Sequence, residues 1–127
     1  MKSLLGTTAI VEGLTGLALA TMPSFVVTAL LGTSLTDASG ILLGRLAGGL
    51  LIALAIACGL LRQDLQGFLM VKIMAGYNIF TILLLVHAAL VEKMNGFGLW
   101  PTVFLHAGLL IWCLGCLFRR VNITPVL

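Results

Sequence analysis

Four long stretches of the chain are apolar almost without interruption, and short polar connections separate them. They cover residues 4–22, 38–61, 67–91 and 99–118. A helix that rises about 1.5 Å per residue crosses the hydrocarbon core of a bilayer in roughly 20 residues. None of the stretches shows the alternating polarity of membrane strands, so the pattern predicts helices. The expected fold class is therefore all-α: a four-transmembrane-helix bundle that forms a single integral membrane domain over residues 1–127.

The connections predict how these spans follow one another. After the first span, Pro23 precedes an apolar run that ends at Gly32. This pattern predicts a short interfacial or re-entrant helix, and the alternative is a first span that continues beyond a proline kink. The connection over residues 62–66 is so short that it makes the second and third spans antiparallel neighbours, with Asp64 available as an N-cap. Residues 95–98 predict a turn before the last span.

Composition and charge agree with a membrane protein and add an orientation. Hydrophobic residues make up 61% of the chain and charged residues 9%, which excludes a disordered chain and argues against nucleic-acid binding. Lys2, Arg62 and the pair at 119–120 fall on one side of the predicted bundle, whereas Asp37 lies on the other side, together with Lys93 beside Glu92. Because cytoplasmic loops are enriched in Lys and Arg, both termini are expected in the cytoplasm.

The second span carries the strongest packing signal. Gly40, Gly44 and Gly48 form two overlapping GxxxG spacings on one helix face. Small residues drive helix association in lipid because they allow backbones to approach closely. The glycine face predicts either central packing within one bundle or contact with a second copy of the chain in a homo-oligomer.

Glu12 is the most informative ionisable residue within the spans. It falls near the centre of the first span, on a polar stripe with Thr8, Thr15 and Gly16 that should face the bundle interior. A carboxyl group at this depth either pairs with a cation or holds a proton, since burial disfavours its charged form. The cation could be Arg45 or Lys72, although Lys72 can also extend its amine to the cytoplasmic interface.

Two histidines are expected at similar depths on neighbouring antiparallel spans. His87 lies near the end of the third span and His106 near the start of the fourth. With Arg45 at the same level, they could ligate haem iron or bind a quinone or another lipophilic ligand, and the alternative is a packing role. Asn78 is a further inward-facing candidate, and no dedicated metal site is predicted.

Three cysteines fall near the cytoplasmic ends of their spans. Cys113 and Cys116 have CxxC spacing, and Cys58 lies on the second span. The helix dipole at a C-terminal end disfavours a thiolate, and the reducing cytoplasm disfavours a disulfide. These residues are therefore expected to be small packing residues, and a redox couple with a quinone is the alternative.

With these residues in place, the chain resembles the DoxX-like group and other small four-span bacterial inner-membrane proteins. The likeness rests on Glu12-Gly13 and Gly16 before Pro23, on Arg45 with Gly48-Gly49, and on Trp100-Pro101 leading to His106. Some members of the group accompany quinone or thiosulfate oxidation as accessory subunits. The resemblance implies a multi-pass protein of the bacterial cytoplasmic membrane.

The expected function is that of a small non-enzymatic membrane protein, an oligomeric or accessory subunit whose polar core holds a lipophilic ligand. Glu12, Arg45, His87 and His106 are the candidate ligand-binding residues, with Asn78 beside them. One alternative is a proton- or cation-coupled transporter that uses Glu12. Another is a membrane redox protein with haem or quinone near the two histidines. Phosphate-binding loops and the sequence motifs of soluble hydrolases are missing from the chain.

Overall fold

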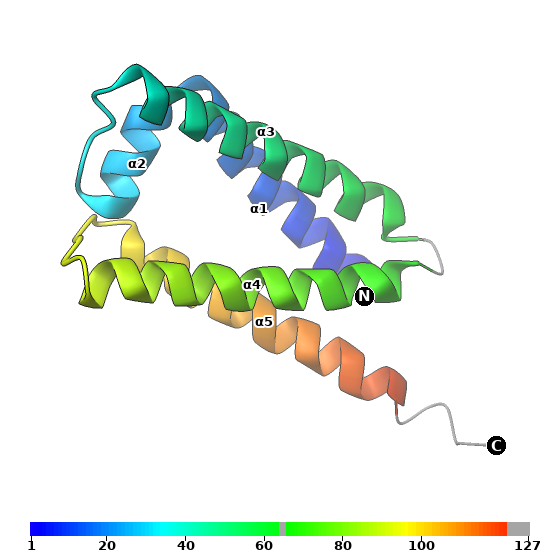
Figure 1. Cartoon of the computed structure of the whole chain (residues 1–127). Helices are drawn as coiled ribbons and strands as arrows, with labels where there is room; N and C mark the ends of the chain where they lie inside the picture. Colours follow the sequence, from blue (N-terminus) through cyan, green and yellow to red (C-terminus); the bar gives the residue numbers. More distant parts are fainter. Residues whose placement is uncertain (64–65, 122–127) are drawn as a thin grey trace.

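A computed structural model of the chain describes residues 1–63 and 66–121 (Figure 1). This part of the chain is all-α and consists of five helices: α1 (Lys2–Thr21), α2 (Pro23–Leu31), α3 (Ala38–Leu61), α4 (Gly67–Leu90) and α5 (Leu99–Val121). The four long helices match the predicted spans to within two residues at each end, except that α5 extends three residues further. The predicted cap Asp64 lies outside the described residues.

Local backbone chemistry separates α2 from α1. Met22 leaves the helical region with φ −130° and ψ 59°, and Pro23 then occupies the first turn of α2, where its missing N–H is not needed. Gly32 ends α2 in the left-handed conformation with φ 79°. The short helix is therefore confirmed, and the first span does not continue past the proline. The side chain of Asp37 then caps α3 by accepting a hydrogen bond of 2.8 Å from the backbone N–H of Gly40.

The four long helices are each long and apolar enough to cross a membrane. Their side chains are mostly directed outwards, because only 17% of the span in α3 and 33% of the span in α4 is buried within the protein. Large apolar residues such as Leu43, Leu50 and Phe80 are exposed. An apolar surface of this kind is stable in contact with lipid chains, so the chain is a multi-pass integral membrane protein.

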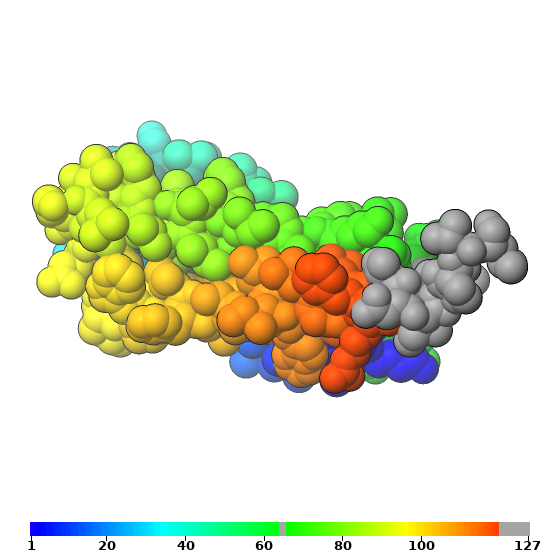
Figure 2. All heavy atoms as spheres, turned by 90° about the horizontal axis from the view of Figure 1, so that it is seen from below, coloured from blue at the N-terminus to red at the C-terminus, as the bar shows by residue number. Residues whose placement is uncertain are grey.

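The long helices form two pairs. α1 packs mainly on α3, and α4 packs mainly on α5, whereas contacts between the pairs are few. Figure 2 shows α4 and α5 side by side along one face of the molecule. The α1–α3 backbones touch at glycine: a Cβ on Gly48 would lie 2.5 Å from the backbone nitrogen of Ala20, and one on Gly16 would lie 2.8 Å from the carbonyl oxygen of Gly48. Gly48 therefore faces α1 of the same chain.

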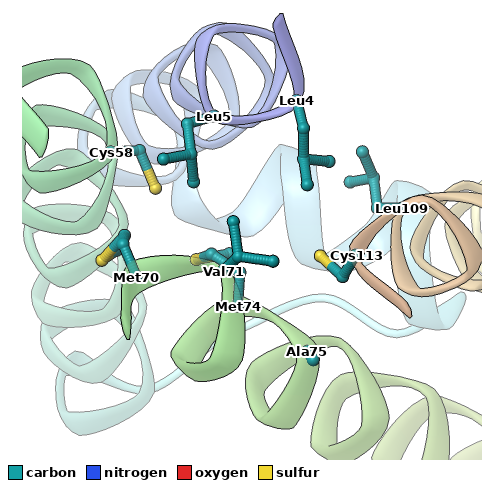
Figure 3. Close-up of a cluster of buried hydrophobic side chains, with 9 residues drawn as sticks. All are labelled: Leu4, Leu5, Cys58, Met70, Val71, Met74, Ala75, Leu109 and Cys113. Carbon is teal, nitrogen blue, oxygen red and sulfur yellow. The ribbon is translucent and has the colours of Figure 1, made fainter. Parts of the chain in front are cut away.

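A buried apolar cluster joins the two pairs at the end of the bundle where α1 begins. Leu4 and Leu5 of α1 meet side chains of α3, α4 and α5 there (Figure 3). The cluster consists of Leu4, Leu5, Cys58, Met70, Val71, Met74, Ala75, Leu109 and Cys113. It closes this end of the molecule.

The opposite end is closed by α2, which lies next to the connection between α4 and α5 (Figure 1). The backbone N–H of Asn95 donates to the carbonyl of Leu31 at 3.2 Å, and that of Gly98 donates to the carbonyl of Ala29 at 2.8 Å. A side chain on Gly96 would overlap the backbone of Leu30. Backbone contact thus fixes α2 over the end of the bundle.

Candidate functional site

A cavity of about 360 Å³ lies between the two closed ends, and α1, α2, α4 and α5 supply most of its wall. The wall is mainly apolar, with residues such as Val11, Leu19, Val26, Leu30, Leu84 and Leu105. Six polar side chains interrupt it: Glu12, Thr15, Tyr77, Thr81, Thr102 and His106. An apolar cavity with a few polar groups is the usual form of a small-molecule site, and this volume is at the lower end of the range for such sites.

Among the described residues, Glu12 is the only acidic side chain in the cavity wall. It is 2% exposed and lies ten residues after the start of α1, a rise of about 15 Å, which places it near mid-membrane. The hydroxyl of Tyr77 donates a hydrogen bond of 3.0 Å to its Oε2. Its other oxygen, Oε1, is buried and has no hydrogen-bond partner among the described residues. One oxygen of this carboxyl group is therefore left without a hydrogen bond from the described part of the chain.

Within the described part of the chain, neither candidate cation forms an ion pair with Glu12. Arg45 is exposed and lines a second, more open pocket beside the start of α2. Lys72 is exposed as well, and its Nζ lies 4.8 Å from the centroid of the Phe68 ring. The ion pair of Glu12 with Arg45 or Lys72, which the sequence left open as one alternative, is therefore not formed among the described residues.

His106 is buried, 6% exposed, and Asn78 holds it in one orientation. The Asn78 side-chain amide donates from Nδ2 to the carbonyl of Met74 at 2.7 Å, so its Oδ1 is the atom that faces His106 Nδ1 at 2.7 Å. An amide oxygen only accepts, so Nδ1 carries the hydrogen and Nε2 of the neutral ring is left as an acceptor. The ring also meets Tyr77 edge-on, with centroids 5.7 Å apart.

His87 lies elsewhere. Its side chain is 57% exposed, and its Nδ1 is 3.8 Å from a carboxylate oxygen of Glu92 near the end of α4. It does not line the cavity that His106 lines. Among the described residues, no group of three or more His, Cys, Asp or Glu side chains is arranged to hold a metal ion. Glu12, Asn78 and His106 are thus brought to one region, and Arg45 and His87 are not.

The cysteines lie away from the cavity. Cys58 and Cys113 are fully buried free thiols in the apolar cluster at the α1 end, and Cys116 packs against that cluster as a partly buried free thiol. Their neighbours there are leucine, methionine and valine side chains. This environment is that of packing residues.

Sequence reasoning did not identify two parts of the site. Nothing in the sequence singled out Tyr77 as the hydrogen-bond donor to Glu12, 65 residues earlier. The α2 contribution to the wall, through Val26, Ala29 and Leu30, was also not anticipated. The hydrogen bond between Tyr77 and Glu12 could have been suggested by their positions, since each lies in the middle of a predicted span.

Comparison with models of protein families, with curated proteins and with solved structures gives no match. The resemblance to the DoxX-like group therefore stays a prediction, and the function has to be argued from the geometry of the site.

Proposed function

We propose that this protein binds a small lipophilic ligand with a polar end in the membrane-embedded cavity between α1, α2, α4 and α5. One observation carries the proposal: Glu12, which lines the apolar cavity, has a buried carboxyl oxygen, Oε1, that no described residue satisfies. An unpaired polar atom in an apolar interior costs roughly 1–3 kcal/mol, and a ligand group that hydrogen-bonds to it would recover that energy. The activity is binding, without a chemical reaction.

The polar groups are grouped so that they could orient such a ligand. Glu12, Tyr77 and His106 come from three helices and meet near mid-membrane, where Tyr77 contacts both of the others. The wall towards α2 is mainly apolar. A ligand would therefore place its polar end beside Glu12 and its apolar end beneath α2, with its entry route from the lipid.

The test is to purify the full chain in a mild detergent, extract bound molecules with solvent and identify them by mass spectrometry. We expect one lipophilic species in stoichiometric amount, and we expect His106→Ala to lose most of it. His87→Ala is the matched control, since it removes an exposed imidazole outside the cavity and should retain the species. Equal retention in both variants, or a protein that carries no such molecule from any host and binds none added, would contradict the proposal.

The distribution of charge adds an orientation to this proposal. Lys2 and Arg62 lie at the α1 end of the bundle, and Asp37 lies at the α2 end. With the positive end in the cytoplasm, α2 covers the outer side and the cavity occupies the outer half of a bacterial cytoplasmic membrane. A ligand would then enter from the outer leaflet.

A second candidate function is proton-coupled transport. Two observations favour it: Glu12 lies between two helix pairs that contact each other weakly, and no described cation neutralises it. Relative movement of the pairs could expose the carboxyl group to either side in turn. Proteoliposomes with an internal pH-sensitive dye should then acidify under an applied gradient, and Glu12→Gln should abolish the flux. Flux that is unchanged in this variant would exclude the mechanism.

A further inference from the structure

The polar groups of the cavity share one feature: nearly all of them have already used their donor hydrogen inside the protein. Tyr77 donates to Glu12, Thr81 donates to the carbonyl of Tyr77, and Thr102 donates to the carbonyl of Gly98. His106 uses the hydrogen on Nδ1 towards Asn78. Of the polar side chains in the wall, only the exposed Thr15 has a hydroxyl hydrogen without a described acceptor. Apart from this hydroxyl and a proton that Glu12 itself can hold, the polar side chains of the wall offer acceptor lone pairs.

Among the described residues, the cavity wall contains an acidic side chain, Glu12, and no basic Lys or Arg. The carboxyl oxygen Oε1 is buried and unpartnered. A carboxyl group in an apolar interior is stable either with a proton bound or beside a positive charge, and the described chain supplies no cation at this place.

We propose that the ligand is a lipophilic amine that binds as its ammonium ion, with N–H donors directed at Glu12 Oε1 and at the lone pair of His106 Nε2. This inference rests on the proposed binding function and specifies its ligand class. A primary ammonium group carries a positive charge and three donors, so it matches both the charge and the acceptor-rich wall. The volume of about 360 Å³ holds roughly a dozen groups of the size of water or methylene, at about 30 Å³ each.

Other polar ends match the cavity less well. A fatty acid would bring a second carboxylate next to Glu12 without any cation between them. An alcohol brings one donor and no charge. A quaternary ammonium ion brings the charge but has no N–H to donate. These differences define a set of probes that share one apolar chain and differ only in the polar end.

The experiment uses the full chain in lipid nanodiscs and follows its thermal unfolding midpoint during titration with hexylamine, hexanol, hexanoate or hexyltrimethylammonium. Hexylamine is protonated at pH 7, as a lysine side chain is. We expect it to reach half-saturation at about fivefold lower concentration than hexanol, because a charge-assisted hydrogen bond is worth roughly 1 kcal/mol more than a neutral one. Hexyltrimethylammonium should be weaker than hexylamine, and hexanoate should not bind. In Glu12→Gln the half-saturating concentration of hexylamine should lie within about twofold of that of hexanol. In His87→Ala the difference between the two probes should be the same as in the unaltered chain.

The outcomes separate this inference from the proposed function. If hexanol or hexanoate binds as well as hexylamine, the amine assignment is wrong and a ligand-binding cavity remains. If none of the probes shifts the midpoint, both proposals fail. Because the comparison of probes is made on the unaltered chain, it decides the question even if Glu12→Gln does not fold.

Discussion

At the scale of single residues, the polar interior of this protein consists of two hydrogen-bonded pairs, Glu12 with Tyr77 and Asn78 with His106. Each pair joins two different helices, α1 with α4 and α4 with α5. Tyr77 and Asn78 are adjacent in the sequence, so a single turn of α4 hydrogen-bonds to Glu12 on α1 and to His106 on α5. α4 therefore holds the two polar partners in fixed positions relative to each other.

The Glu12–Tyr77 bond leads to the first prediction. Tyr77→Phe removes the only described hydrogen-bond donor to Glu12 and leaves both carboxyl oxygens unsatisfied, which should destabilise the protein by about 1–3 kcal/mol. The measurement is the free energy of unfolding in a mixed-detergent titration. Thr21→Val, which removes an exposed hydroxyl, should change it by less than about 0.5 kcal/mol. A Tyr77→Phe variant as stable as the parent would show that the bond contributes nothing to stability.

Helical spacing predicted which residue types belong inside the bundle but not which of them meet. Thr8, Glu12 and Gly16 of the predicted stripe are buried, and so are His106 and Asn78, but Thr15 is exposed. The pairing of Glu12 with Tyr77, instead of with Arg45 or Lys72, depends on the rotation of α4 relative to α1. Periodicity within one helix carries no information about that rotation. The two histidines were expected at similar depths, yet His87 lies on an exposed face of α4 and His106 lies inside.

At the scale of helices, the limits of the elements were predictable because they depend on local chemistry. Pro23, Gly32 and Asp37 each act on their own turn of backbone. The pairing of the helices was not predictable in the same way. α1 packs mainly on α3 because glycines on both helices let the backbones touch. This contact forms only if the helix face that carries Gly16 lies against the face that carries Gly48.

This contact gives a second prediction. Gly48→Val places new atoms against the backbone of Ala20, which cannot move aside as a flexible side chain could, so the α1–α3 pair should separate at a cost of about 3 kcal/mol or more. Gly49→Val is the matched control, since nothing lies within 4 Å of a Cβ at that position. Thermal unfolding of the two variants in the same detergent provides the comparison. Equal midpoints would show that the close contact is not needed.

The seating of α2 gives a third prediction. Gly96→Ala should displace α2, because the added methyl group would overlap the backbone of Leu30, and the expected loss of stability is about 1–3 kcal/mol. The backbone N–H groups of Asn95 and Gly98, which donate to α2, should exchange with deuterium faster in this variant. Phe97→Ala is the control within the same turn, since this side chain is 83% exposed. Unchanged exchange at both amides would show that α2 accommodates the methyl group.

At the scale of the whole molecule, the two helix pairs of the bundle are joined mainly at its two ends. The apolar cluster at the α1 end and the contact of α2 with the α4–α5 connection hold the two helix pairs together. The cavity lies between these two ends, and residues of both pairs line it.

The orientation of the whole molecule is the fourth prediction. Thr33→Cys and Gln63→Cys place thiols at exposed positions on opposite ends of the bundle. In a background with the three native cysteines changed to alanine, a membrane-impermeant maleimide added to spheroplasts should label residue 33 and leave residue 63 unlabelled until the membrane is permeabilised. The reverse pattern would place the cavity in the inner half of the membrane.

The distance of 65 residues between Glu12 and Tyr77 also has a consequence for how the protein is made. A ribosome that adds about 5 to 20 residues per second needs about 3 to 13 s to synthesise the donor after the acceptor. During this interval α1 and its carboxyl group must wait at the insertion machinery or in the lipid without their partner. The glycine contact with α3 can form before Tyr77 is available, so the first pair can insert as a unit with its carboxyl group still unsatisfied. Until α4 has been synthesised, Glu12 therefore lacks the hydrogen bond that Tyr77 supplies in the folded protein.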